Sequence, residues 1–371
     1  MIYVNEPFFS NREKELLMEC IDTGWVSSEG PFVKKFEKGF AKYVGHKYGI
    51  AVCNGTAALE VALHAIGVEE GDEVILPSFT IISCALAILR LGARPVLVDI
   101  TPDIWNMDVS QIESKITSKT KAIMPVHIYG HSVDMDPLLS IARKYNLKII
   151  EDASQVHGAE YKGKKLGSIG DISTFSFYAN KIISCGEGGM ILTSSEEMLE
   201  KAQKYRNLYF EPKKRFLHQE LGYNFRMTNI QAALGVAQME KIDLFIEIKR
   251  KFGEYYREKL KNIQGIRFQE EKSWAKSVYW MYSIEITRDI NLEADELMAK
   301  LREVGIDSRP FFIGLHEQPA LHKKGLFIDE TYPNTEYAAR KGLYLPSGLA
   351  LTEKQVDEVC EKLKIIMQGY T

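Results

Sequence analysis

Short apolar runs alternate with amphipathic stretches between Tyr48 and Thr193, and this alternation constrains the fold more than any other feature. Strands are expected where Val, Ile and Leu cluster, at 48–53, 73–76, 94–100, 121–126 and 147–152. Helices are expected between them, at 55–67, 82–92 and 135–146. Such strands with helical crossovers form a mainly parallel sheet covered on both faces, and its ligands bind beyond the carboxyl ends of the strands.

The remaining chain predicts a second, smaller unit, because 371 residues exceed one ordinary core. Residues 227–262 form a long helical pattern without a Gly-Pro break. A strand at 279–286 and helices at 295–305 and 353–367 follow. The prediction is an α/β protein with a large domain at 1–240, including the N-terminal segment, and a small C-terminal α+β domain at 241–371.

Composition excludes several classes of protein. The hydrophobic fraction of 45% and charged fraction of 26% are typical of soluble globular chains. A net charge of −3 offers no basic surface for nucleic acid. No apolar run reaches membrane-spanning length, and the first residues lack a signal-peptide pattern. The five cysteines are isolated, which favours reduced thiols in the cytoplasm over disulfides or a metal site.

Lys181 is the first candidate for chemistry. It follows a β-prone run and precedes a glycine cluster in TFSFYANKIISCGEGG (174–189). A buried ammonium needs a partner or loses its proton, and a neutral lysine attacks carbonyl groups. The alternative is a lysine that extends to the surface from a strand end.

A second candidate site is the strand-to-helix turn CNGTAAL (53–59). Gly55 permits a sharp turn, and Thr56 and Ala57 then present N–H groups at the positive end of a helix, where phosphate binds well. The alternative is a capped helix without a ligand. Ser176, five residues before Lys181, has a hydroxyl that can face the same anion.

Acidic residues end the strand at 147–152. Asp152 can cap the next segment, or it can keep a proton on a heterocyclic nitrogen, as a pyridine electron sink requires. Gln155 has an amide that can reach a ring hydroxyl. His157 is either a substrate-side group or, as we favour, a structural histidine.

These motifs together resemble one family. The segments NGTAAL, EDASQ, TFSFYANK and GEGGMILT, in this order, resemble the sugar-nucleotide aminotransferases, which are pyridoxal-phosphate enzymes of fold type I. The resemblance extends from GWVSSEGPFVKKFE (24–37) through GYNFRMTNIQAALG (222–235) to GIDSRPFF (305–312). Within the family the chain is most similar to GDP-perosamine synthases, which aminate the 4-keto position of a GDP-linked 6-deoxy sugar.

The resemblance implies a role for each candidate. Lys181 would bind the cofactor covalently and later transfer a proton, Asp152 would pair with the ring nitrogen, and Gln155 would bond the ring hydroxyl. Gly55, Thr56, Ala57 and Ser176 would form the phosphate site. Asn224 of a partner subunit would complete that site in a homodimer. The substrate candidates are Trp25, Arg309, Phe311 and Phe312, although Arg309 can equally be a surface arginine.

Two positions depart from the family pattern. Ile81 stands in PSFTII (77–82) where many relatives have an aromatic residue, so it would cover the cofactor ring without π-stacking. Gln155 stands where perosamine synthases often have Glu. The expected reaction transfers an amino group from L-glutamate to a nucleotide-linked keto sugar, most closely GDP-4-keto-6-deoxy-mannose, for O-antigen or another surface glycan.

Three alternatives remain. A 3- or 4-aminotransferase acting on a dTDP- or UDP-linked sugar would show the same motifs. Related sugar dehydratases resemble a variant with histidine at the lysine position, so Lys181 argues against them. The intact set of Lys, Asp, Ser and Thr argues against a non-catalytic regulatory protein.

Overall fold

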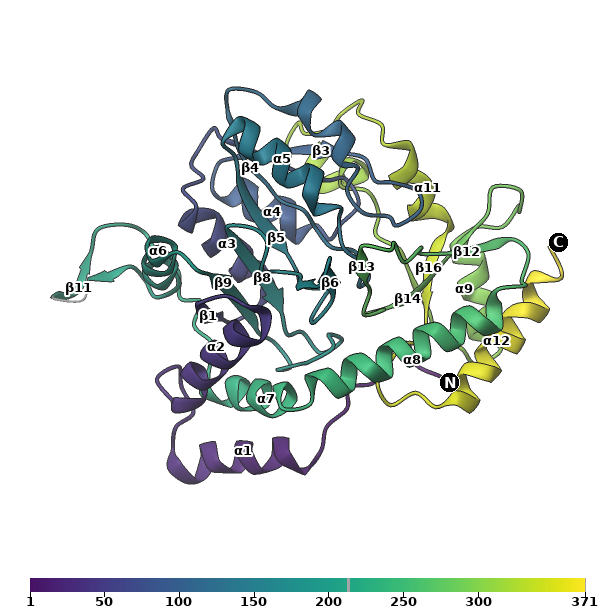
Figure 1. The fold of residues 1–371 in the computed structure, drawn as a ribbon, viewed down its shortest axis with the longest axis horizontal. Helices are drawn as coiled ribbons and strands as arrows, with labels where there is room; N and C mark the ends of the chain where they lie inside the picture. The colour runs from purple at the N-terminus through teal and green to yellow at the C-terminus, as the bar shows by residue number, and fades with distance from the viewer. Residues whose placement is uncertain (212–213, 371) are drawn as a thin grey trace.

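The computed structural model describes residues 1–211 and 214–370, and a seven-stranded sheet organises its larger part (Figure 1). The strand order is β1-β9-β8-β5-β4-β2-β3. Strand β9 runs antiparallel to both its neighbours, and the other neighbouring pairs are parallel. The predicted mainly parallel sheet is therefore confirmed. Its strands are β1 (Tyr48–Val52), β2 (Glu73–Pro77), β3 (Arg94–Val98), β4 (Thr120–Ile123), β5 (Lys148–Asp152), β8 (Ile172–Ser176) and β9 (Gly189–Thr193).

Helices flank this sheet, as the alternating sequence pattern predicts. Every residue of β9 is buried, which requires cover on both faces of the sheet. Both α2 and α3 contact β1 and β9, and α7 packs against α1 and α2. The helices of this part are α1 (Asn11–Thr23), α2 (Pro31–Val44), α3 (Gly55–Ala65), α4 (Ser83–Arg90), α5 (Met135–Tyr145), α6 (Glu196–Arg206) and α7 (Asn229–Met239).

A smaller antiparallel sheet of four strands, in the order β12-β14-β16-β15, organises the C-terminal part. Its apolar side chains form a second hydrophobic cluster with α9, α12 and the end of α8. Its elements are β12 (Ile266–Phe268), β14 (Tyr282–Ile286), β15 (Arg309–Pro310), β16 (Gly342–Leu345), α8 (Ile242–Leu260), α9 (Ala294–Glu303), α11 (Pro333–Lys341) and α12 (Glu353–Met367). The boundary predicted at residue 240 falls between α7 and α8 and stays a prediction.

Short elements connect these parts. One hairpin projects from the large part of the molecule (Figure 1) and consists of β10 (Phe210–Glu211) and β11 (Lys214–His218). A three-stranded sheet and short helices lie in the remaining loops: β6 (Glu160–Tyr161), β7 (Lys164–Lys165), β13 (Ala275–Lys276), α10 (Pro319–His322), and the 3-10 turns at Val109–Gln111, Glu113–Lys115 and Leu315–Glu317.

The prediction of one uninterrupted helix over 227–262 is wrong. The chain forms α7 and α8, with Glu240 and Lys241 between them, and Lys241 has non-helical dihedrals (φ −123°, ψ 8°). Glu240 accepts a hydrogen bond from Arg12 at 3.1 Å, and Lys241 Nζ bonds the Ser10 hydroxyl. The break between the two helices therefore coincides with contacts to the N-terminal segment. The sequence at the break contains no Gly or Pro that would predict it.

The strand predicted at 279–286 begins only at Tyr282, and the three preceding residues form a loop. Tyr279 has a positive φ of 45°, and Val278 N donates to Gly130 O at 3.1 Å. The loop passes so close to Gly130 that a Cβ there would lie 2.7 Å from the backbone nitrogens of Tyr279 and Trp280. Trp280 therefore precedes the strand, and its Nε1 donates to the Asn180 carbonyl at 2.8 Å.

Among the described residues, no helix has both the length and the apolar character needed to cross a membrane. The five cysteines are all free thiols.

Candidate active site

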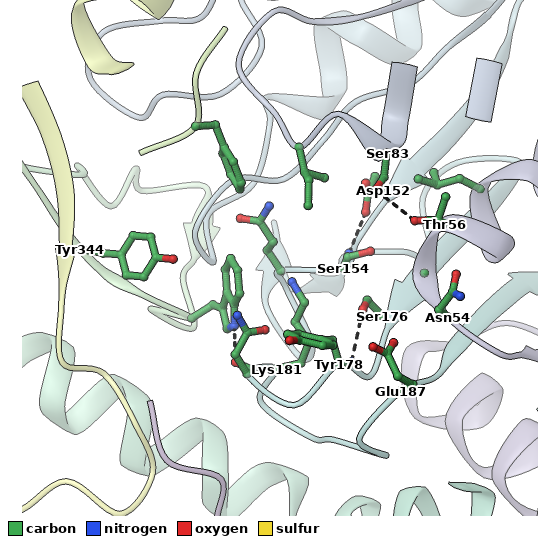
Figure 2. A pocket seen from close by; sticks show the side chains of 17 residues that line it. Asn54, Thr56, Ser83, Asp152, Ser154, Ser176, Tyr178, Lys181, Glu187 and Tyr344 are labelled. Carbon is green, nitrogen blue, oxygen red and sulfur yellow. Dashed lines mark hydrogen bonds between the residues drawn. The ribbon is translucent and has the colours of Figure 1, made fainter. Parts of the chain in front are cut away.

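A cavity of about 410 Å³ opens at the carboxyl ends of β1, β2, β5 and β8 (Figure 2). These four strands point the same way, so the segments that follow them meet at one edge of the sheet. Eight of the predicted residues line the cavity: Gly55, Thr56, Ile81, Asp152, Gln155, Ser176, Lys181 and Phe312. The tertiary structure thus assembles most of the predicted site.

Lys181 presents its amine to this cavity (Figure 2). The residue borders the opening and is half-buried, but protein atoms crowd the amine. This desolvation lowers the pKa of Lys181 from 10.5 to about 7, while the Asp152 carboxylate opposes the shift. The amine lies 3.7 Å from the ring centroid of Trp280. Near neutral pH a large fraction of Lys181 is therefore uncharged and nucleophilic.

Asp152 ends strand β5 and is 3% exposed. Its Oδ1 accepts the Ser154 N–H at 3.0 Å, and its Oδ2 accepts the Cys84 thiol at 3.2 Å. Burial, and then the Asp152 charge, raise the pKa of the Cys84 thiol well above its usual value, so the thiol keeps its proton and remains a donor. Two donors from different elements thus orient the carboxylate at the cavity wall.

Glu151, the neighbouring acid, has a different environment. It is fully buried, and its two oxygens accept the N–H groups of Gly167, Ile169 and Gly170 at 2.9, 2.7 and 2.6 Å. His127 Nε2 lies 3.2 Å away. Because successive side chains on a strand alternate between faces, Glu151 anchors the 167–170 turn while Asp152 borders the cavity.

Gln155 is oriented by one backbone contact. Its Oε1 accepts the Tyr129 N–H at 2.8 Å, which leaves the Nε2 donor for the cavity. That orientation suits the predicted bond to a ring hydroxyl. Ile81, which is 47% exposed, lines the same cavity and offers only an apolar surface.

The predicted phosphate end of the cavity lies at the start of α3. Asn54 caps this helix, and its Oδ1 accepts the Ala57 N–H at 2.8 Å. The Ala57 N–H therefore already has a hydrogen-bond partner within the chain. Thr56 Oγ1 donates to Ser83 Oγ at 3.0 Å. Gly55 packs closely on β8, where a Cβ would lie 2.9 Å from the Ser176 Cβ. The turn therefore places the hydroxyls of Thr56 and Ser176 on the same cavity wall.

Five predicted residues lie outside this cavity. Phe311 is 2% exposed and packs against Trp105 and Tyr129, behind the wall formed by Phe312. Arg309 is exposed and pairs with Asp307 at 2.9 Å. The other three are the half-exposed Trp25, the exposed Asn224, and Ala57 in the cap of α3.

Sequence reasoning missed several residues that line the cavity. Asn54 and Ser83 had a detectable signal, since both stand where a helix begins. Tyr178 also had a signal, since it stands between Ser176 and Lys181 in the TFSFYANK segment. Trp280 and Tyr344 had none, because long-range packing brings them to the site. His157, which we favoured as structural, does pack among Phe40, Phe175 and Phe177, and burial lowers its pKa to about 3.

The lining residues fit the predicted cofactor chemically. An amine with a lowered pKa can bind an aldehyde, a buried carboxylate can pair with a protonated ring nitrogen, and two hydroxyls beside a helix start can bind a phosphate. A volume of about 410 Å³ is within the usual range for small-ligand pockets. Within the described residues, no group of three or more His, Cys, Asp or Glu side chains could hold a metal ion.

Comparison with known proteins supplies independent information. The model of the DegT/DnrJ/EryC1/StrS aminotransferase family matches residues 8–364. The GDP-perosamine synthase of Caulobacter vibrioides is 41% identical over 367 residues, which cover 99% of this chain and 98% of that protein. The GDP-perosamine synthase of Escherichia coli O157:H7 is 41% identical, with 98% and 97% covered.

A solved structure has the same fold. The PLP-form of Spr1654 from Streptococcus pneumoniae superposes with a TM-score of 0.94 at 26% identity, covering 99% of both chains.

Proposed function

We propose that this chain transfers the amino group of L-glutamate to GDP-4-keto-6-deoxy-mannose and so makes GDP-perosamine. The proposal starts from its family, because the chain belongs to the DegT/DnrJ/EryC1/StrS aminotransferases. The chain is a pyridoxal 5′-phosphate-dependent transaminase, as the family is. Two GDP-perosamine synthases that are 41% identical over nearly the whole chain support the choice of substrate. The product would enter O-antigen or another surface glycan.

One structural observation carries the proposal: the Lys181 amine and the Asp152 carboxylate line the same cavity. Pyridoxal 5′-phosphate, when bound, supplies an electron-poor ring that stabilises negative charge on the carbon beside the amino group. Asp152, oriented by Cys84 and Ser154, would keep the ring nitrogen protonated. Thr56 and Ser176 would bind the phosphate, and Gln155 would donate to the ring hydroxyl.

Lys181 would supply both covalent attachment and proton transfer. With a pKa of about 7 its Nζ can remove the proton from the α-carbon of glutamate in the first half-reaction and deliver a proton to the sugar carbon in the second. Lys181 would pass the first proton on to the bound cofactor and would take the second one from it. Ile81 and Phe312 would exclude water from the apolar walls. These roles are proposals and rest on placement, burial and hydrogen bonding.

A second cavity of about 320 Å³ adjoins the first and suits the nucleotide part of the substrate. The two cavities share Tyr178, Asn180 and Tyr344. Arg309 lines only the second one, and a guanidinium there can bind a diphosphate. We assign Arg309 to substrate binding on this basis, and Phe312 because it lines the first cavity. Trp25 and Phe311 stay candidates by resemblance.

We place the enzyme in the cytoplasm as a homodimer. Five free thiols suit a reducing compartment. Asn224 is exposed and lies outside its own cavity, as expected of a residue that completes the site of a partner subunit.

The test is a panel of GDP-, dTDP- and UDP-linked 3-keto and 4-keto sugars with L-glutamate, with products identified by mass and NMR. We expect the GDP-linked 4-keto sugar to exceed the others in kcat/KM by about tenfold or more. In Lys181→Ala, turnover should fall by at least about 10²–10⁴-fold while the fold is kept.

Two results would contradict the proposal separately. Preference for a dTDP- or UDP-linked sugar would overturn the substrate and leave the reaction intact. Steady-state amination by Lys181→Ala at the wild-type rate would overturn the assignment of the reactive amine.

A further inference from the structure

We infer that Trp280 is a positioning residue of the reaction: its indole face receives the free ammonium of Lys181 whenever the covalent bond to the cofactor is open. Lys181 Nζ lies 3.7 Å from the centre of this ring. An ammonium over the face of an indole is attracted by the negative face of the π-system, and Trp is the strongest such partner. The inference rests on Lys181 being the reactive amine and not on the nature of the nucleotide.

The indole is held rigidly in place. Its Nε1 donates to the Asn180 carbonyl at 2.8 Å, so the ring is tied to the residue directly before Lys181. The backbone carbonyl of Trp280 accepts Lys249 Nζ at 2.6 Å. The ring is stacked near Tyr129, with centroids 6.3 Å apart and planes 25° from parallel. Trp280 is only 5% exposed.

The amine has few competing partners. Within residues 1–211 and 214–370, Lys181 Nζ makes no hydrogen bond or ion pair in this structure, and the indole is its one cation–π partner. The Asp152 carboxylate favours the charged amine at longer range. The indole face is therefore the contact that locates the ammonium.

The contact between the Lys181 ammonium and the indole has a consequence for proton transfer. Within each half-reaction Lys181 Nζ must hold the proton that it removes from one carbon until it delivers that proton to another, without the amine leaving the cavity. An ammonium on the indole face keeps both its charge and its position, so the same atom that removes a proton can deliver it within that half-reaction.

Other titratable groups approach the amine and must be held constant in a test. Burial, and then the charge of Lys181, lower the pKa of His157, which stays neutral. Lys249, behind Trp280, also has a pKa lowered by burial to about 7. The groups that line the same cavity are Asp152, Tyr178, Glu187 and Tyr344.

The experiment measures the pKa of Lys181 in the full-length protein freed of cofactor. The protein is trace-labelled with acetic anhydride over a range of pH against an internal amine standard, and the Lys181 peptide is followed by mass spectrometry. Wild-type protein is compared with Trp280→Phe and Trp280→Leu. Tyr344→Leu is the matched control, since it removes an aromatic ring from the same cavity.

We expect Trp280→Leu to lower the Lys181 pKa by about 0.5 to 1.5 and Trp280→Phe to lower it less. The direction is diagnostic, because the space left by Leu admits water, which alone would raise the pKa. Tyr344→Leu should leave the Lys181 pKa unchanged.

An unchanged or raised Lys181 pKa in Trp280→Leu overturns the inference, and so does an equal fall in Tyr344→Leu. If Trp280→Leu does not fold, Trp280→Phe decides by the same criterion. Neither result depends on turnover, so this experiment tests the role of Trp280 independently of the proposed substrate.

Discussion

At the scale of single residues, two adjacent carboxylates at the end of β5 have separate tasks. Asp152 faces the cavity and accepts hydrogen bonds from one thiol and one N–H group. Glu151 faces the opposite side and binds three N–H groups of the 167–170 turn. Burial alone would raise the pKa of Glu151, but the hydrogen bonds from His127, Gly170 and Gly167 outweigh it and lower that pKa. Glu151 therefore stabilises the folded state in its charged form.

Glu151→Gln should lower the free energy of unfolding by roughly 2–4 kcal/mol, because an NH₂ group would face N–H donors. Urea unfolding of the full-length protein measures the loss. Glu197→Gln is the control, because its side chain is 76% exposed, and it should change stability by less than about 0.5 kcal/mol.

The loss of stability in Glu151→Gln should depend on pH in a direction that follows from the pKa of Glu151. The folded pKa lies below the ordinary 4.5, so the contribution of Glu151 is complete above about pH 4.5 and disappears as the pH falls through the folded value. The stability gap between wild type and Glu151→Gln should narrow over that acidic range. A gap that widens on acidification would show that the buried carboxylate is not the stabilising form.

At the scale of elements, the junction of β1 with α3 and β8 positions the predicted phosphate site. Asn54 caps α3, and Gly55 in the first turn lies against Ser176 at the end of β8. The helix and the strand are close here because Gly55 has no side chain. The two hydroxyls assigned to the phosphate are therefore held by a single close contact.

Gly55→Ala should weaken pyridoxal 5′-phosphate binding by about tenfold or more, since a Cβ 2.9 Å from the Ser176 Cβ forces the strand end or helix to shift. Fluorescence titration of the cofactor-free protein measures the affinity. Gly39→Ala in α2 is the control, because its Cβ would meet only the flexible end of Met239 at 3.0 Å. Equal affinities of Gly55→Ala and wild type would contradict the proposed phosphate site.

At the scale of the whole molecule, the cavity depends on residues from both sheets and, as we propose, from a second subunit. Tyr344 reaches the cavity from β16 of the small sheet. Lys249 of α8 donates to the carbonyls of Trp280 and Ser347, and so links α8 to the loops before β14 and after β16. Asn224 is exposed on its own subunit.

Shared sites predict complementation between two inactive variants. Lys181→Ala and Asn224→Ala should each lose activity, but co-refolded mixtures should regain part of it, since half the sites of each heterodimer carry both native residues. Activity of the mixture and its native mass are the measurements, with refolded single variants as controls. Absence of recovery in a confirmed heterodimer would place Asn224 outside the partner's site.

The amino-acid sequence by itself determined the parallel sheet, the edge at which the site lies and eight of the residues that line the cavity. Local periodicity marks strands, and parallel strands bring their following segments to one edge. It also determined the family, through co-linear motifs around Gly55, Asp152 and Lys181.

Only the tertiary structure decided the break between α7 and α8, the separate tasks of Glu151 and Asp152, and the place of Trp280. Each depends on contacts between residues far apart in the chain: Arg12 with Glu240, Glu151 with the 167–170 turn, and Gly130 with the loop before β14. Such contacts leave no periodic pattern in the sequence, because their free energy exists only once distant segments have packed together.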